Sequence, residues 1–242
     1  MKLFITGIGS GLGKALAEEA LNRGYEVYAI SRHLPKELEG RVKFVSADLS
    51  QIERIYMHVS KLLQGVKKLQ LVILNAGILG KMKDMREISL QEMEEVMRIN
   101  LWANKVIIDT LMDLEIKVEQ LIGISSGAAK NCNRGWNAYS ISKAGLNCML
   151  KLYSWEMPGT HIVSLAPGLV LTPMLMEVMS QNEEKFPSIE RIKKAPKLTP
   201  ERAAEFIFNV IPKLKTFESG SFVDVRDFPE YEDFINKYGV YS

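Results

Sequence analysis

Short apolar runs alternate with helix-like segments along nearly the whole chain, and this alternation limits its possible folds more than any other feature. The apolar runs carry few charges, as expected of strands that are buried on both faces of a parallel sheet. The predicted strands are 3–5, 25–30, 42–45, 69–74, 120–124, 161–166 and 221–225. The predicted helices are 14–22, 52–63, 89–112 as one segment or two, 137–155, and a last one at 199–210. We therefore predict an α/β fold, a doubly wound parallel sheet with helices on both faces.

Length and composition narrow the class of protein further. The 242 residues suit a single domain spanning 1–242, and 47% hydrophobic with 25% charged residues exclude a disordered or low-complexity chain. The formal net charge is only +2, which is too small for a protein that mainly holds a polyanion. We therefore expect no nucleic-acid partner.

Cysteine and histidine usage gives no sign of a metal site. Cys132 and Cys148 lack metal-ligand spacing, and the three histidines are scattered. The N-terminus has no signal-peptide pattern, and no apolar stretch reaches the ~18 residues of a membrane span. We expect a cytoplasmic protein with free thiols, no metal and no membrane partner.

Residues 172–197, called the lid below, form the one long stretch without a strand signal. We expect a flap or a pair of short helices there, because long connections in compact domains are often functional. Methionines gather in it, at 174, 176 and 179. They either fill irregular gaps in the core or form a flexible apolar cover over a substrate.

Small or polar residues occupy the positions where the predicted strands end. These are Thr6-Gly7, Ser31-Arg32, Asp48, Asn75-Ala76-Gly77, Ser125-Ser126 and Pro167-Gly168. In open parallel sheets, ligands bind beyond the carboxyl ends of the strands. This rim therefore predicts a site for an extended ligand.

The first chemical motif is the glycine-rich turn between the first strand and the first helix. Gly7, Gly11 and Gly13 follow the spacing G-x-x-x-G-x-G rather than G-x-G-x-x-G. Missing side chains let the backbone approach a pyrophosphate, and a helix N-terminus supplies N–H groups and a positive dipole end. The alternative is a structural turn packed against the sheet.

The second motif is Tyr139 with Lys143, four residues apart on a predicted helix. This spacing places both side chains on one helical face, so the ammonium can lie near the phenol. A nearby cation favours the phenolate, although a pair at this spacing also occurs by chance on helix surfaces. The residues around the pair decide between the two interpretations.

Taken together, the motifs resemble those of the short-chain dehydrogenase/reductase family over nearly the whole chain. The matching residues are Gly7, Gly11, Gly13, Asn75, Ala76, Gly77, Asn100, Ser126, Tyr139, Lys143, Pro167, Gly168 and Thr172. The resemblance implies a single-domain Rossmann-like fold and oxidoreductase activity with a nicotinamide cofactor.

It also implies roles for four residues. Tyr139 would donate a proton to the carbonyl oxygen as hydride arrives, and Ser126 would hydrogen-bond that oxygen. Lys143 would bind the nicotinamide ribose and lower the Tyr139 pKa, and Asn100 would hold a water that connects Lys143 to solvent. Preorganised donors of this kind stabilise charge developing on oxygen. Ser125 is expected to be buried or structural.

The implied cofactor-binding set spans all of the predicted strand ends. It comprises Gly7, Ser10, Gly11, Leu12, Gly13, Ser31, Arg32, Asp48, Leu49, Asn75, Ala76, Gly77, Tyr139, Lys143, Pro167, Gly168, Val170 and Thr172. Asp48 would contact the adenine by its position in the family, or it caps the following helix. No carboxylate follows the second strand to accept from a ribose 2′-OH, and Arg32 suits a 2′-phosphate. This favours NADP(H), unless Arg32 is merely solvated.

Within the family, residues 125–130, 135–139 and 142–147 are most similar to the branch of benzil and sepiapterin reductases. The resemblance implies an NADPH-dependent carbonyl reductase acting on a small ketone or vicinal dicarbonyl. Expected substrate contacts are Leu79, Trp136, Leu169 and Met174, with Trp136 serving as a pocket wall or as a packing anchor. The alternatives are an NAD-dependent alcohol dehydrogenase and a cofactor-binding regulator without turnover. A homodimer is expected from the resemblance and from the apolar residues of 89–112.

Overall fold

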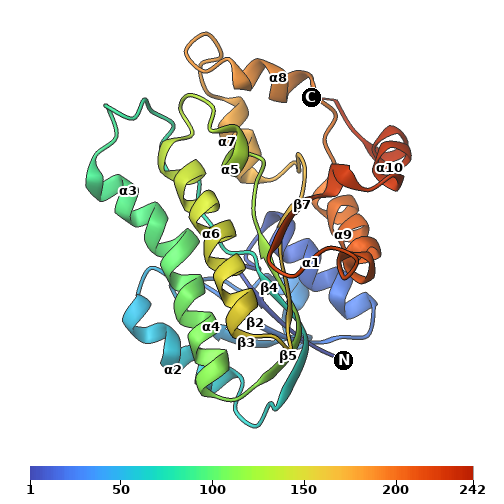
Figure 1. The fold of residues 1–242 in the computed structure, drawn as a ribbon. Coiled ribbons are helices and arrows are strands. Elements are labelled where there is room, and N and C mark those ends of the chain that lie inside the picture. Colours follow the sequence, from blue (N-terminus) through green and yellow to red (C-terminus); the bar gives the residue numbers. More distant parts are fainter. Residues whose placement is uncertain (242) are drawn as a thin grey trace.

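In the computed structural model, which describes residues 1–241, all seven predicted strands form and join one sheet (Figure 1). They are β1 (Lys2–Thr6), β2 (Glu26–Ser31), β3 (Lys43–Ser46), β4 (Lys68–Leu74), β5 (Lys117–Ile124), β6 (His161–Ala166) and β7 (Ser221–Asp224). Their order is β3-β2-β1-β4-β5-β6-β7, and every neighbouring pair is parallel. The predicted doubly wound parallel sheet is confirmed. The last position of the predicted domain, 242, lies outside the described residues.

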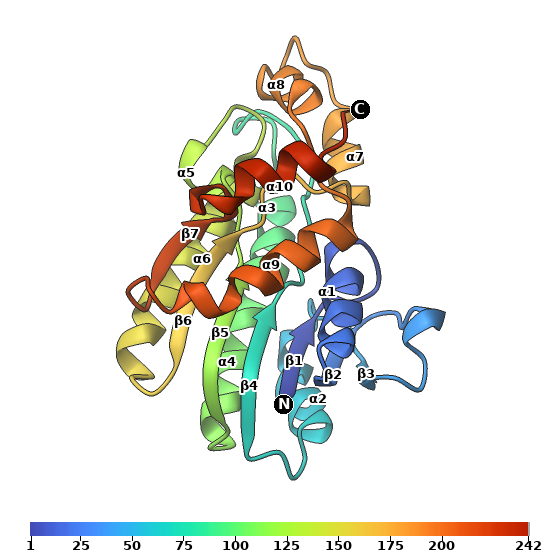
Figure 2. The ribbon, with the colours of Figure 1, turned by 90° about the vertical axis from the view of Figure 1, so that its right-hand side faces the viewer.

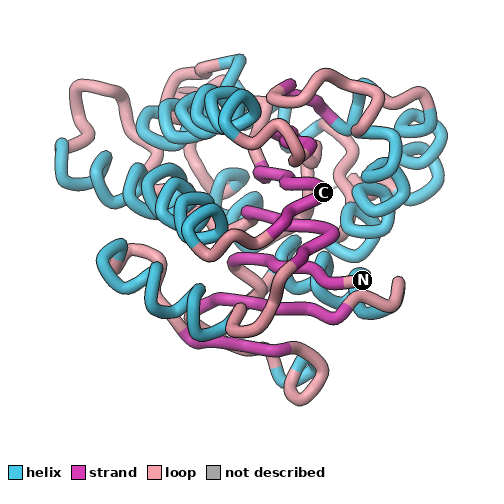
Figure 3. The backbone as a smooth tube through the Cα atoms, turned by 60° about the horizontal axis from the view of Figure 1, so that its bottom comes forward, coloured by secondary structure: helices cyan, strands magenta, loops and turns pink. Residues whose placement is uncertain are grey.

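Helices cover both faces of the sheet, as the edge-on view in Figure 3 shows. One face carries α1 (Gly11–Asn22) and α9 (Pro200–Leu214), and the other carries α2 (Ile52–Leu62), α4 (Ala103–Asp113) and α6 (Asn137–Glu156). Strand β1 serves both layers because its side chains alternate with period two. Leu3 and Ile5 are buried toward α1 and α9, and Phe4 is buried toward α2, α4 and α6.

The predicted helical region 89–112 is one continuous run with a local change of pitch. It consists of α3 (Leu90–Met97), a π-helical turn η2 (Arg98–Trp102) and α4. A capping box starts it, in which Ser89 Oγ accepts from Glu92 N at 3.2 Å and Glu92 accepts from Ser89 N at 3.0 Å. Single π-turns inside helices are frequent at functional sites, and Asn100 lies in this one.

The lid folds into two short helices, α7 (Pro173–Met179) and α8 (Ser188–Lys194), as one of the two expectations had it. The residues on either side of the lid are hydrogen-bonded to each other, from Leu171 N to Leu198 O at 2.9 Å and from Leu198 N to Leu169 O at 3.0 Å. Lys197 also pairs with Val240 near the end of the chain. Backbone hydrogen bonds therefore hold together the two segments of chain that enter and leave the lid.

The C-terminal part differs from the sequence prediction. Helix α9 continues to Leu214, and a further helix, α10 (Glu230–Tyr238), follows β7 and lies against α9 (Figure 2). The prediction that 199–210 is the last helix was therefore wrong. The missed signal in α10 is an apolar i, i+3, i+4, i+7 stripe that packs against the core. Its members are Tyr231, Phe234, Ile235 and Tyr238.

Short elements were also missed, because three or four residues give no readable period. They are α5 (Ala128–Asn131), η1 (Lys36–Leu38) and η3 (Val225–Asp227). Among the helices of residues 1–241, none combines the length and the apolar character that a membrane span requires.

Candidate active site

A cavity of about 700 Å³ opens beyond the carboxyl ends of strands β1 to β6. The strands β2 and β3 lie on one side of β1 and the later strands from β4 onward on the other, so the cavity lies at the switch point, where open α/β sheets bind ligands. Every predicted cofactor- and substrate-binding residue lines it, together with Ser126, Tyr139 and Lys143. Only Asn100 of the predicted set does not.

The glycine-rich turn forms the floor of one half of this cavity. A Cβ on Gly13 would lie 1.9 Å from Gly7 O, and a Cβ on Gly7, where φ is +76°, would lie 2.8 Å from Ala76 Cα. Neither position can carry a side chain. Ser10 stands at the N-cap of α1 without a side-chain capping hydrogen bond, and Gly11 to Gly13 line the cavity. The first turn of α1 therefore fits the pyrophosphate of a dinucleotide.

Asn75 attaches the end of β4 to this turn. Its Nδ2 donates to Thr6 O at 3.2 Å and to Gly7 O at 3.0 Å, and Thr6 Oγ1 accepts from the backbone N–H of Asn75 and of Ala76. The side-chain amide thus holds the glycine turn in its shape rather than pointing to a ligand. Its neighbours Ala76 and Gly77 form the cavity wall.

The end of β2 supplies the only arginine among the described residues that line the cavity. The Arg32 guanidinium is exposed and forms no hydrogen bond or ion pair with residues 1–241. Ser31 lies next to Gly9, and a Cβ added to Gly9 would be 3.4 Å from Ser31 Oγ. Asp48 accepts from Ser50 N at 2.9 Å, which together with the Arg32 charge lowers the pKa of its carboxyl. Asp48 does not cap α2, whose N-cap is Gln51 without a side-chain hydrogen bond, but it closes the turn before α2 and lines the cavity.

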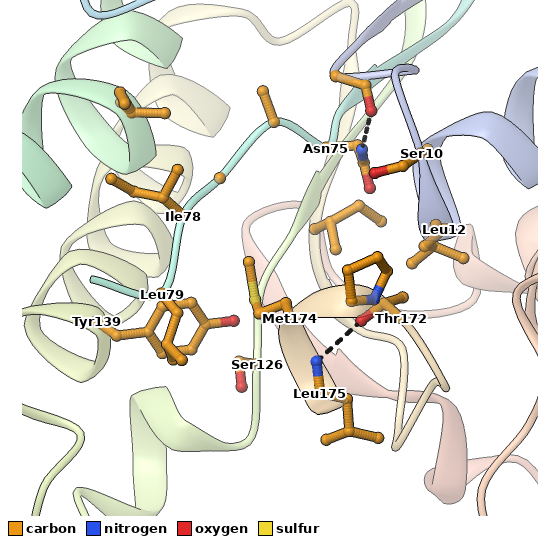
Figure 4. A pocket seen from close by; sticks show the side chains of 18 of the residues that line it. Ser10, Leu12, Asn75, Ile78, Leu79, Ser126, Tyr139, Thr172, Met174 and Leu175 are labelled. Atoms are coloured by element: carbon orange, nitrogen blue, oxygen red, sulfur yellow. Dashed lines mark hydrogen bonds between the residues drawn. The ribbon is translucent and has the colours of Figure 1, made fainter. Parts of the chain in front are cut away.

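The other half of the cavity holds the predicted acid. Tyr139 lies on α6 beside Ser126, which follows β5, whereas Ser10, Leu12 and Thr172 occupy the opposite end in Figure 4. Ser126 Oγ accepts from Ala128 N at 3.1 Å, so its own hydroxyl proton is available to an oxygen in the cavity. Ser125 is 2% exposed and donates to Asn147 Oδ1 at 2.6 Å, which is a structural contact.

Lys143 is buried one helical turn from Tyr139. Its Nζ donates to Ile124 O at 2.7 Å and lies 5.8 Å from the centre of the Tyr139 ring. Gly77 lies beside this ammonium, and a Cβ there would be 3.2 Å from Asn100 Oδ1 and 3.4 Å from Lys143 Nζ.

Burial dominates the acid–base properties of both groups. It raises the pKa of Tyr139, against the smaller opposing effect of the hydrogen bond with Ser126. It also lowers the pKa of Lys143 from 10.5 to about 8. The direction of the Tyr139 shift is thus opposite to the lowering predicted from Lys143, because desolvation of the buried phenol is its largest cause. At neutral pH the phenol therefore keeps its proton, as a general acid requires.

Asn100 lies behind the cavity and is fully buried. Its Nδ2 donates to Ile78 O at 2.9 Å and to Ser142 Oγ at 3.0 Å, and its Oδ1 accepts from Ile78 N at 2.8 Å. This two-way clamp fixes the backbone of Ile78, which lines the cavity next to Gly77.

Apolar side chains from three segments wall the half of the cavity around Tyr139. Leu79, Trp136 and Leu175 belong to a buried cluster that also includes Tyr139, and Leu169 and Met174 pack against it. Trp136 combines the two roles considered for it, since it is 9% exposed, packs in this cluster and lines the cavity.

The structure adds cavity residues that the sequence prediction missed. Ile78 and Lys81 flank the predicted Leu79, and Glu177 and Val178 follow Met174 by one turn of α7. Helical spacing from the Thr172 cap, whose Oγ1 accepts from Leu175 N at 3.2 Å, was the available signal for the last two. His33, next to Arg32, was also missed.

Comparison with known proteins agrees with this geometry. A family model described as short chain dehydrogenase matches residues 2–183. Benzil reductase ((S)-benzoin forming) of Bacillus subtilis (strain 168) is 30% identical over 243 residues, covering 94% of this chain and all of the relative. The enzyme of the same name from Bacillus cereus is 30% identical and covers 93% of this chain and 99% of its own.

A solved structure shares the fold. The KRED1-Pglu enzyme superposes with a TM-score of 0.79 at 24% sequence identity, over 92% of this chain and 100% of its own. Together with the family model, which spans most of the sheet and the cavity, these matches confirm the resemblance seen in the sequence. The chain belongs to the short chain dehydrogenase family, near its benzil reductases.

Proposed function

We propose that this oxidoreductase is an NADPH-dependent carbonyl reductase of small ketones or vicinal dicarbonyls, with Tyr139 as the general acid. The observation that carries the proposal is the buried phenol of Tyr139, kept protonated by its surroundings and placed beside the Ser126 hydroxyl in an apolar half-cavity. The glycine turn and the open first turn of α1 fit a dinucleotide in the other half.

The residues of the chain suit each part of the reduction. A bound nicotinamide cofactor supplies the hydride. Ser126 donates a hydrogen bond to the carbonyl oxygen, and Tyr139 gives it a proton as negative charge develops there. Lys143 holds a positive charge below pH 8 next to the Tyr139 ring, and it supports the ribose of the cofactor. The apolar wall excludes water and so strengthens both hydrogen bonds to the oxygen.

Two alternatives make different demands on the same cavity. An NAD-dependent alcohol dehydrogenase needs an acceptor for the ribose 2′-OH after β2, where this chain has Ser31 and Arg32. A cofactor-binding regulator needs no proton donor, yet Ser126, Tyr139 and Lys143 all face the cavity. Both features favour the reductase.

The test is a turnover screen with the purified protein. NADPH oxidation is measured with benzil, simple diketones, sepiapterin and quinones, and each reaction is repeated with NADH. We expect reduction of at least one dicarbonyl and a higher kcat/KM for NADPH than for NADH. Cofactor binding without turnover of any carbonyl would favour the regulator, and faster alcohol oxidation with NAD would favour the dehydrogenase.

The affinity for NADPH is expected to depend on pH through Lys143. Its pKa of about 8 means that the ammonium is lost as the pH rises above this value, and the contact with the cofactor weakens. Loss of one charge-assisted hydrogen bond corresponds to about a tenfold rise in Kd between pH 7 and 9.5. Fluorescence titration at each pH gives the Kd.

Two variants show which group titrates. Tyr139→Phe should keep the rise in Kd, whereas Lys143→Met should bind NADPH weakly at every pH with no such rise. A rise that disappears in Tyr139→Phe would assign the titration to the phenol instead.

The lid is proposed to close over the substrate after NADPH has bound. Thr172 is the N-cap of α7 and lies against the glycine turn, since a Cβ on Gly11 would be 3.1 Å from Thr172 Cγ2. Contact with the cofactor at this point should slow amide hydrogen exchange in residues 172–197. Helix α2 does not line the cavity and serves as the internal reference, in which exchange should not change. Exchange that is already as slow in the free protein would mean that the lid is a fixed part of the scaffold.

We also propose a homodimer in the cytoplasm. The dimer is supported by the family and by the exposed apolar side chains of Trp102 and Met112 on the helical run η2–α4. The cytoplasmic location is supported by the two free, exposed cysteines. Light scattering at micromolar concentration should give twice the chain mass of 27.3 kDa. A mass equal to one chain would contradict the dimer.

A further inference from the structure

The indole of Trp136 is hydrogen-bonded to a residue of the lid. Trp136 precedes α6, lines the cavity, and packs against Tyr139 with ring centres 5.8 Å apart. Its Nε1 donates to Ser188 Oγ at 3.0 Å, and both residues are 9% exposed. Ser188 is the first residue of α8, 52 positions further along the chain.

A second contact joins the segment before α8 to the backbone that precedes Trp136. Gly135 has φ of +92°, and a Cβ there would lie 2.5 Å from Cδ1 of Phe186. The Phe186 ring therefore sits directly on the backbone before Trp136. Phe186 and Ile189 are 3% and 0% exposed, so this packing is tight.

Helix α8 itself stays out of the cavity. Within the described chain, none of the residues Ser188 to Lys194 lines it, whereas Trp136 does. The hydrogen bond from Trp136 to Ser188 therefore joins α8 directly to a side chain that lines the cavity. A buried indole N–H needs an acceptor, and Ser188 Oγ is the one the fold provides.

We propose that Ser188 is a positioning residue for the carbonyl substrate. It fixes the plane of the Trp136 ring beside Tyr139 and so sets the affinity for the substrate without touching the cofactor half of the cavity. This inference rests on the proposed reductase function, and it adds a specificity element that lies outside the cavity.

The test is a double-mutant cycle with the carbonyl compound that the turnover screen identifies. Ser188→Ala should raise the KM for that compound about fivefold, as expected for the loss of one buried hydrogen bond, while kcat and the Kd for NADPH stay within about twofold. In a Trp136→Phe background, which has no indole N–H, the same change should alter KM by less than about twofold. Ser188→Thr keeps the hydroxyl and should restore the low KM.

Ser180→Ala is the control, because the hydroxyl of this exposed lid serine donates to Glu177 O and lies outside the cavity. It should leave KM unchanged. An unchanged KM in Ser188→Ala, or an equal rise in both backgrounds, would overturn the proposal.

Acrylamide quenching of tryptophan fluorescence provides a readout that needs no turnover. Trp102 and Trp155 are 46% and 69% exposed, so the signal of the buried Trp136 is the difference from Trp136→Phe. Ser188→Ala should make this component more accessible to the quencher, and unchanged quenching would also overturn the inference. If the unaltered protein reduces no carbonyl at all, the proposed function fails, and quenching still decides whether Ser188 holds the indole.

Discussion

Replacement of Tyr139 by Phe is expected to lower kcat for carbonyl reduction by about 10²- to 10⁴-fold, the usual range for loss of a general acid. The substitution removes only the hydroxyl, whose side-chain partner is Ser126, and keeps the ring in its apolar cluster. The fold and the affinity for NADPH should therefore persist. Steady-state kinetics, thermal unfolding and fluorescence titration measure the three quantities.

Tyr153 offers a matched control on the same helix. It is also buried, but its hydroxyl bonds to Asp109 and lies outside the cavity. Tyr153→Phe should keep kcat within about twofold, since a hydrogen bond to a carboxylate outside the cavity contributes to stability rather than to the reaction. A Tyr139→Phe variant with more than half of the original kcat would remove the phenol from the mechanism.

Replacement of Arg32 by Ala is expected to discriminate between the two nicotinamide cofactors. A charge-assisted contact with the 2′-phosphate contributes about 1.5–3 kcal/mol, which corresponds to roughly a 10- to 150-fold rise in the Kd for NADPH. NADH lacks this phosphate, so its Kd should change by less than about twofold. The guanidinium is already exposed at the cavity edge and makes no hydrogen bond within residues 1–241, so its removal should leave stability unchanged.

Arg41→Ala is the control for the loss of one exposed positive charge. Arg41 is exposed, donates to Glu37 O and does not line the cavity. It should change neither cofactor affinity by more than about twofold at physiological ionic strength, where exposed charges are screened. Equal losses of NADPH and NADH affinity in Arg32→Ala would show that Arg32 does not select the cofactor.

The sheet and the glycine turn could be predicted from the sequence because both depend on local rules. Strands buried on both faces need continuous apolar runs, so the run 69–74 already indicated a central strand, and it forms most of β4. A Cβ at Gly7 or Gly13 would clash with the backbone or with a neighbouring residue. The spacing of these glycines in the sequence therefore already indicated the shape of the turn. Tyr139 and Lys143 share a helical face for the same kind of local reason.

Other properties depend on partners that are distant in sequence, and only the tertiary structure decided them. The hydrogen bonds from the Asn100 side chain to the backbone of Ile78 join positions 22 apart, and nothing in the sequence pointed to them. The hydrogen bond from Trp136 to Ser188 joins positions 52 apart, and no periodic pattern in the sequence indicates it.

The same holds for the direction of the Tyr139 pKa shift. The residue pattern predicted a lowered value from one neighbouring charge, but the lid, α6 and Leu79 together bury the phenol and raise it. The spacing of residues along the chain determined which groups meet on one helix or turn. How strongly they are desolvated was decided by segments far apart in sequence, because burial is a property of everything packed around a group and not of its neighbours along the chain.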